Sequence, residues 1–72
     1  MDRLKALEIF KTVADKRSFA KAAEALNLSN PSVSRTVREL ETMLGVRLMQ
    51  RTTRRVALTS AGQDVLDRPR GL

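Results

Sequence analysis

The chain has 72 residues, and its 3 % aromatic content means that a core must be built from aliphatic side chains. Fourteen lysines and arginines against eight aspartates and glutamates give a formal net charge of +6, which favours a polyanionic partner. With no cysteine and no histidine, the sequence offers no thiolate metal site and no imidazole base, so metal and catalytic sites are not expected. It also lacks a membrane-length apolar stretch and a secretory leader, so we expect one small, cytoplasmic domain without membrane contact.

A first amphipathic helix is predicted from Asp2 to Lys16, with Asp2 as its N-cap. Apolar residues recur at helical spacing and are predicted to face the core: Leu4, Leu7, Phe10, Val13 and Ala14. The charged residues between them are expected to face solvent: Lys5, Glu8, Lys11 and Asp15.

Two further helices with a very short connection predict a helix-turn-helix over about residues 18–38. Ser18 is suited to cap the second helix, whose inward positions are Phe19, Ala22, Ala23 and Leu26. Residues 27–29 form the connection, where Asn27 tolerates the left-handed backbone of a sharp corner. Either Ser29 or Asn30 caps the third helix, and Pro31 fits its first turn.

The third helix is predicted to have two distinct sides before Gly45 ends it. At about 100° per residue, one narrow arc faces the core and holds Val33, Val37, Leu40 and Leu44. The opposite side holds Pro31, Ser34, Arg35, Arg38 and Thr42.

Alternating residues after this helix predict two short strands, a wing at about residues 46–58. Val46, Leu48, Val56 and Leu58 alternate with residues such as Arg47 and Met49, and residues 51–54 form the predicted tip. Ser60 and Gln63 resemble a capping box that opens a last helix, which Pro69 and Gly71 stop. We therefore divide the chain into a winged helix-turn-helix at 1–59 and the start of a linker helix with a short tail at 60–72.

The third helix has the two sides that a helix in the major groove of DNA requires. Arg35 can donate two hydrogen bonds to guanine or bind a phosphate, and Ser34 can reach either kind of acceptor. Arg38, one turn later, is better placed for the DNA backbone. The amide of Asn30 suits adenine or an N-cap equally well, and both interpretations stay open. Pro31 is a helix starter that can also contact a thymine methyl group.

Backbone or minor-groove contacts are assigned to residues at helix starts and in the wing: Ser18, Ser32, Arg38, Arg51, Thr53, Arg54 and Arg55. Ser18 is first a cap, yet the N-terminus of its helix can also hold a phosphate. The predicted tip and the residue after it, 51–55, contain three arginines and two threonines. Such a loop suits phosphate or minor-groove binding, although a solvated basic surface is the simpler explanation for any single arginine.

With these elements assigned, the sequence resembles the N-terminal domain of LysR-type transcriptional regulators. The similarity runs without a gap to about Val65. It is carried by Leu4, Phe10, Val13, Ser18-Phe19, Ala22-Ala23, Leu26, Ser29-Asn30-Pro31-Ser32-Val33-Ser34-Arg35, Leu40-Glu41, Leu44-Gly45-Val46-Arg47-Leu48, Arg51, Leu58-Thr59 and Ala61-Gly62.

The resemblance implies a mainly α, winged helix-turn-helix that binds double-stranded DNA as a homodimer or higher oligomer. In this family, residues at the positions of Asn30, Pro31, Ser34, Arg35 and Arg54 commonly contact DNA. Asn30 stands where the family usually has the longer glutamine. Met49 stands where it has phenylalanine or leucine, a substitution that a core position tolerates. The family continues into a long linker helix and an effector domain, so a 72-residue chain is expected to be a fragment or a truncated regulator.

Other functional classes fit the sequence less well than sequence-specific DNA binding in transcription regulation. A truncated interaction module, which pairs with full-length regulators and modulates their assembly, is the main alternative. Non-specific RNA binding is disfavoured because aromatic stacking platforms are nearly absent. An enzyme is disfavoured because no base, nucleophile or metal cage is apparent, and no cofactor or small-molecule ligand is expected.

Overall fold

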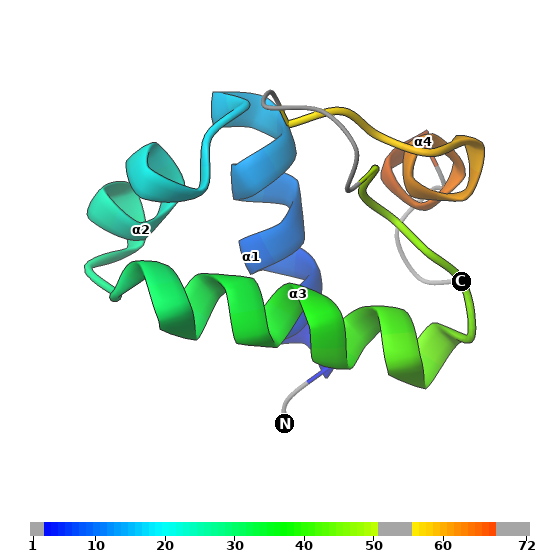
Figure 1. Cartoon of the computed structure of the whole chain (residues 1–72), viewed down its shortest axis with the longest axis horizontal. Coiled ribbons are helices and arrows are strands. Elements are labelled where there is room, and N and C mark those ends of the chain that lie inside the picture. The colour runs from blue at the N-terminus through cyan, green and yellow to red at the C-terminus, as the bar shows by residue number, and fades with distance from the viewer. Residues whose placement is uncertain (1–2, 51–55, 68–72) are drawn as a thin grey trace.

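The fold is mainly helical in a computed structural model that describes residues 3–50 and 56–67. Within those residues the elements are α1 (Arg3–Lys16), α2 (Phe19–Leu26), α3 (Asn30–Leu44) and α4 (Ser60–Asp67). Helices α1, α2 and α3 pack against one another, and α4 lies at the far end of the molecule from α2 (Figure 1). The predicted helix-turn-helix is thus present as α2 and α3.

Capping side chains and left-handed residues determine where α2 and α3 begin and end. The Ser18 hydroxyl accepts a hydrogen bond from the Lys21 N–H at 3.1 Å, so Ser18 is the predicted N-cap of α2. Asn27 ends α2 in the left-handed region, with φ of 59°, as expected for the corner. Gly45 ends α3 in the same region, with φ of 71°.

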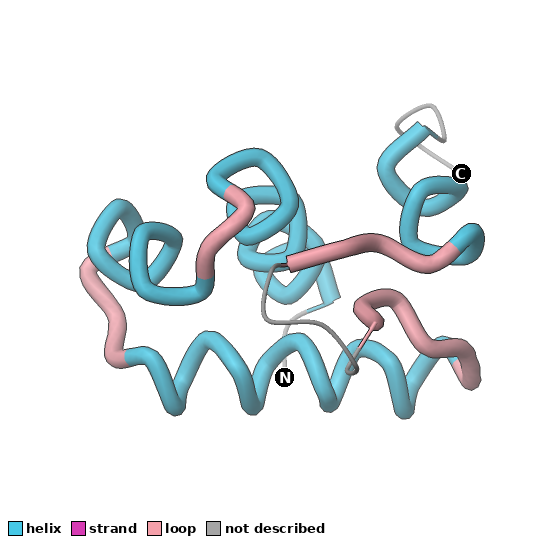
Figure 2. The backbone as a smooth tube through the Cα atoms, turned by 45° about the horizontal axis from the view of Figure 1, so that its top comes forward, coloured by secondary structure: helices cyan, strands magenta, loops and turns pink. Residues whose placement is uncertain are grey.

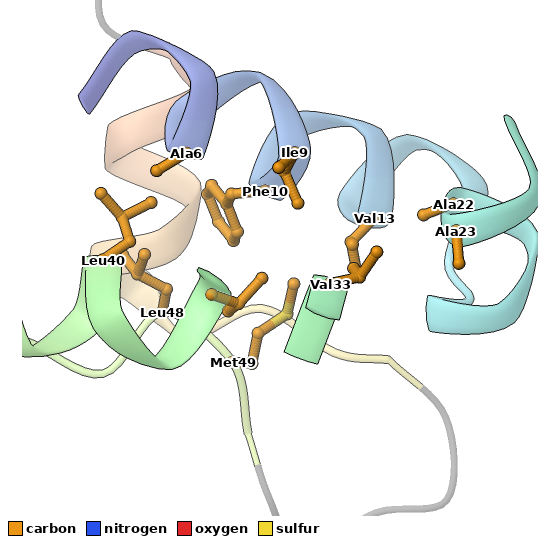
Figure 3. Close-up of a cluster of buried hydrophobic side chains, with 11 residues drawn as sticks. Ala6, Ile9, Phe10, Val13, Ala22, Ala23, Val33, Leu40, Leu48 and Met49 are labelled. Carbon is orange, nitrogen blue, oxygen red and sulfur yellow. The ribbon is translucent and has the colours of Figure 1, made fainter. Parts of the chain in front are cut away.

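One core lies between the helices and the chain after Gly45. Side chains from α1, α2, α3 and residues 48–49 converge in it (Figure 3). Its largest fully buried members are Phe10, Val13, Val33, Val37, Leu40, Leu48 and Met49. The inward positions of α2 are confirmed, because Ala22 and Ala23 are buried and Phe19 and Leu26 pack against the core.

The predicted inward face of α1 is partly wrong. Leu4 is 72 % exposed, whereas Ala6 and Ile9 are buried beside Phe10 and Val13. Positions three residues apart drift by about 60° around a helix with 3.6 residues per turn, so Leu4 and Val13 point in opposite directions. The buried side follows the mixed three- and four-residue spacing of 6, 9, 10 and 13 instead.

Leu44 is also more exposed than predicted, at 36 %. It lies on the same arc of α3 as the buried Val33, Val37 and Leu40. However, the C-terminal end of α3 extends past α1 (Figures 1 and 2), so the arc has less to pack against there.

The predicted wing is represented by one antiparallel bridge between Met49 and Leu58 in the part of the chain that the structure describes. The Gln50 N–H donates to the Ala57 carbonyl at 2.9 Å, and the Thr59 N–H donates to the Leu48 carbonyl at 3.1 Å. The predicted tip, residues 51–54, lies outside the described residues. Figure 2 shows the two flanking segments between α3 and α4.

The predicted alternation does not hold in the first wing segment, whereas the expected core position of Met49 is confirmed. Val46 is 42 % exposed, while Leu48 and Met49 are both buried despite being consecutive. Side chains alternate between two faces only in a regular strand, and here the paired backbone begins near Met49. The segment inserts two neighbouring side chains into the helical core.

The start of α4 differs from the predicted capping box. Ser60 is the first residue of the helix, and the preceding Thr59 accepts a hydrogen bond from the Gly62 N–H at 3.0 Å. The Thr59 hydroxyl also donates to the Arg47 carbonyl. Thr59 therefore caps α4 and ties it to the segment that follows α3, while Pro69 and Gly71 lie outside the described residues.

Candidate nucleic-acid interface

The first turn of α3 is capped by Ser29, which settles one of the two interpretations of Asn30. The Ser29 hydroxyl accepts from the Ser32 N–H at 3.2 Å and donates to the Ser32 hydroxyl at 2.8 Å. Asn30 is the first helical residue and is exposed, so its amide does not serve as the N-cap. The amide is thus available to an external partner.

The polar side of α3 is accessible along most of the helix. Pro31, Arg35, Arg38 and Thr42 are exposed, and Ser34 is half-buried. Residues three and four apart are neighbours on a helix, so these side chains form one continuous surface opposite the buried valines. We call the surface formed by Asn30, Pro31, Ser34, Arg35 and Arg38 the α3 polar face.

The two arginines of the α3 polar face are not neutralised by nearby carboxylates. Across residues 3–50 and 56–67, neither Arg35 nor Arg38 has a side-chain hydrogen bond or ion pair. A guanidinium group that is already paired would have to break that contact before it could bind another acceptor. Both groups therefore remain free to donate to acceptors outside the chain.

Ser18 and Ser32, the predicted backbone-contact residues at helix starts, both take part in caps. The half-buried Ser18 caps α2. The hydroxyl of the exposed Ser32 accepts a hydrogen bond from the hydroxyl of Ser29, the N-cap of α3. The capping role of Ser18 is confirmed, whereas a phosphate contact at either serine stays a prediction. Four other predicted contact residues, Arg51, Thr53, Arg54 and Arg55, lie outside the described residues.

Glu41 joins α3 to the wing segment, a role that its sequence context did not predict. Its Oε2 atom accepts the N–H of Leu48 at 2.8 Å and that of Met49 at 3.1 Å. A glutamate next to a buried leucine on a helix is an ordinary pattern. The Leu40-Glu41 pair in the family-like motif was therefore its only sequence signal.

Neither a metal site nor a membrane span is found in the described part of the chain. No group of three or more acidic residues there is arranged to hold a metal ion. No described helix combines the length and the apolar character that crossing a bilayer requires.

Comparisons with known proteins identify relatives of this domain. Residues 4–63 match the family model described as "Bacterial regulatory helix-turn-helix protein, lysR family". The chain is 53 % identical over 62 residues to the uncharacterized HTH-type transcriptional regulator YfeR of Shigella flexneri, covering 86 % of this chain and 20 % of that protein.

The similar solved structures include complexes with DNA. A crystal structure of BenM_DBD with catB site 1 DNA has a TM-score of 0.83 and 35 % identity, covering 90 % of this chain and 71 % of that one. Vibrio fischeri DarR in complex with DNA has a TM-score of 0.80 and 35 % identity, covering 88 % and 21 %. These matches agree with the predicted winged helix-turn-helix class.

The comparisons concern one part of longer regulators. This chain spans between a fifth and a quarter of the length of three curated relatives that it matches. The similarity nevertheless covers almost every described element, from α1 to the first turn of α4. The chain belongs to the lysR family of bacterial regulatory helix-turn-helix proteins.

Proposed function

We propose that this domain binds double-stranded DNA sequence-specifically and so regulates transcription, with α3 in the major groove. The observation that carries the proposal is the α3 polar face, which is accessible and whose two arginines lie opposite the buried Val33, Val37 and Leu40. A major groove about 12 Å wide accepts one helix held in this way. The DNA complexes of BenM_DBD and DarR support the same use of this fold.

Residues of the α3 polar face have different roles in the proposal. Asn30, Pro31, Ser34 and Arg35 contact base edges, because they occupy the first turns of the helix, which a helix-turn-helix directs at the bases. Ser18, Ser32 and Arg38 contact the DNA backbone. Arg51, Thr53, Arg54 and Arg55, outside the described residues, are proposed to contact backbone or minor groove because of their composition.

The proposed working unit is a homodimer or higher oligomer in the cytoplasm, where bacterial DNA lies. Two domains would place their α3 helices about one turn of DNA apart, ~34 Å, on a roughly palindromic site. Residues 1–59 would form the DNA-binding unit, and α4 would begin the linker helix of a longer regulator. The alternative of a truncated interaction module, which pairs with full-length regulators and modulates their assembly, gains no support from relatives solved with DNA.

A selection from randomised duplexes tests the proposal and does not require the operator sequence as input. The wild-type chain should enrich a defined sequence, which is then titrated with single variants. Arg35→Ala should lose about 1 to 3 kcal/mol of discrimination between this duplex and a scrambled one. Arg38→Ala should weaken binding to both duplexes more evenly, because it removes a backbone contact.

Lys11→Ala provides the matched control, since it removes one exposed positive charge from α1 instead of α3. It should leave discrimination unchanged. If Arg35→Ala behaves like Lys11→Ala on both duplexes, Arg35 does not read bases. If no sequence is enriched, the proposal of sequence-specific binding is wrong.

A further inference from the structure

Glu41 holds the chain after α3 through both its backbone and its side chain. Its carbonyl accepts the N–H of Gly45 at 2.8 Å and that of Val46 at 3.2 Å. Its Oε2 atom accepts the N–H of Leu48 at 2.8 Å and that of Met49 at 3.1 Å. One residue in the last turn of α3 thus binds the turn and the beginning of the wing segment together.

The side-chain contacts supply partners that the wing itself does not provide. In the short antiparallel ladder, Leu48 contributes its carbonyl and Gln50 its N–H. The N–H groups of Leu48 and Met49 are bound by Glu41 instead. Since the side chains of both residues are buried, losing this acceptor would leave donors unpaired beside an apolar core. An ionised carboxylate is also a stronger acceptor than a neutral oxygen.

Glu41 also lies on the helix that carries the α3 polar face. It follows Arg38 by three residues, and its half-buried side chain turns toward the wing segment. The carboxylate therefore ties the backbone of Leu48 and Met49 to the helix that carries Arg35 and Arg38. In the sequence, the segment held in this way leads directly to the arginines at positions 51, 54 and 55.

We propose that Glu41 is a positioning residue for DNA recognition, which fixes the start of the wing relative to α3. The inference rests on the proposed DNA-binding function and adds to it a residue that need not touch DNA. A change that loosens the Glu41 contacts should let the backbone at Leu48 and Met49 move relative to the α3 polar face. DNA binding would weaken if it depends on that placement, while the helical core would remain.

The test uses the 72-residue chain and the duplex that the wild type enriches from a randomised library. Glu41→Asp keeps the charge but shortens the side chain by one methylene group, so its carboxylate no longer reaches both N–H groups. Glu39→Asp makes the same change on an exposed residue of α3. We expect Glu41→Asp to bind the duplex about tenfold more weakly than Glu39→Asp, as losing a charged hydrogen bond predicts.

Hydrogen exchange of individual backbone amides distinguishes a local loss of the Glu41 contacts from a general loss of structure. In Glu41→Asp, the amide hydrogens of Leu48 and Met49 should exchange faster with solvent, while those of Ala22 and Val33 in α2 and α3 keep their wild-type exchange. Glu41→Gln retains the reach and one acceptor oxygen. Glu41→Gln should therefore bind the duplex more tightly than Glu41→Asp does, though more weakly than the wild type.

Several outcomes would overturn the inference. Equal affinity of folded Glu41→Asp and Glu39→Asp would show that the contact does not position the wing. If Glu41→Asp does not fold, the comparison passes to Glu41→Gln and Glu39→Gln, and equal affinity and equal Leu48 exchange in that pair would be equally contradictory. If the wild type enriches no duplex, the proposed function fails first. If it enriches one and the matched pairs are equal, only the role of Glu41 fails.

Discussion

The Leu48 backbone N–H donates to the Glu41 carboxylate at 2.8 Å, and the carbonyl of the same leucine accepts the Thr59 N–H at 3.1 Å. Leu48 is therefore the point at which α3, the returning wing segment and the start of α4 meet. Its side chain is fully buried. Segments distant in the sequence are thus joined through one residue between α3 and α4.

Replacing Gly62 by alanine is predicted to destabilise the domain, because the backbone of α4 at this position lies very close to Leu48. A Cβ at position 62 would overlap the Leu48 carbonyl oxygen and lie 3.1 Å from its carbonyl carbon. Both are backbone atoms that cannot turn away. Gly62→Ala should lower the free energy of unfolding by about 1 to 3 kcal/mol, measured by urea unfolding with circular dichroism.

The neighbouring Ala61 supplies the opposite control. In an ordinary helix position alanine is more stable than glycine, so Ala61→Gly should cost about 0.5 to 1 kcal/mol. A methyl group should thus be favourable at position 61 and unfavourable at position 62. A more stable Gly62→Ala variant would show that α4 does not contact Leu48 this closely.

Leu40 and Leu44 test where the buried side of α3 ends. They occupy the same arc one turn apart, yet Leu40 is fully buried and Leu44 is 36 % exposed. Leu40→Ala should destabilise the domain by about 2 to 5 kcal/mol, a large fraction of a small domain's stability. Leu44→Ala should cost clearly less in the same urea unfolding measurement. Equal losses would indicate that the end of α3 is packed as tightly as its middle.

Ser29 and Asn30 are predicted to separate stability from DNA binding. Ser29→Ala removes the N-cap of α3 and should reduce stability by about 1 kcal/mol. Asn30→Ala leaves that cap intact, so its thermal unfolding midpoint should stay near the wild-type value while its discrimination between duplexes falls. If Asn30→Ala instead lowers stability and leaves discrimination unchanged, its role is structural.

Local sequence patterns predicted the helix-turn-helix well, because its signals lie within a few residues of one another. Ser18, Asn27 and Gly45 have the capping or turn roles that their residue types favour. The buried arc of α3 followed from spacing alone at Val33, Val37 and Leu40. Most of the α3 polar face then followed as the opposite side of the same helix, whereas Asn30 was proposed from the chemistry of its amide.

The remaining features depend on contacts between distant segments, which no local pattern encodes. Leu4 fits an apolar spacing but lies opposite the side on which α1 packs. Met49 is buried because the wing segment enters the helical core, which alternation alone does not predict. Glu41 gains its role only when Leu48 and Met49 fold back onto α3.

The central claim is that the α3 polar face gives this domain sequence-specific affinity for duplex DNA. It is tested most directly by titrating the wild-type chain with the duplex it enriches and with a scrambled duplex of equal composition, at several salt concentrations. We predict weaker binding to both duplexes as salt rises, with a preference for the enriched sequence at every concentration. Equal affinity for the two duplexes at every salt concentration would contradict the claim.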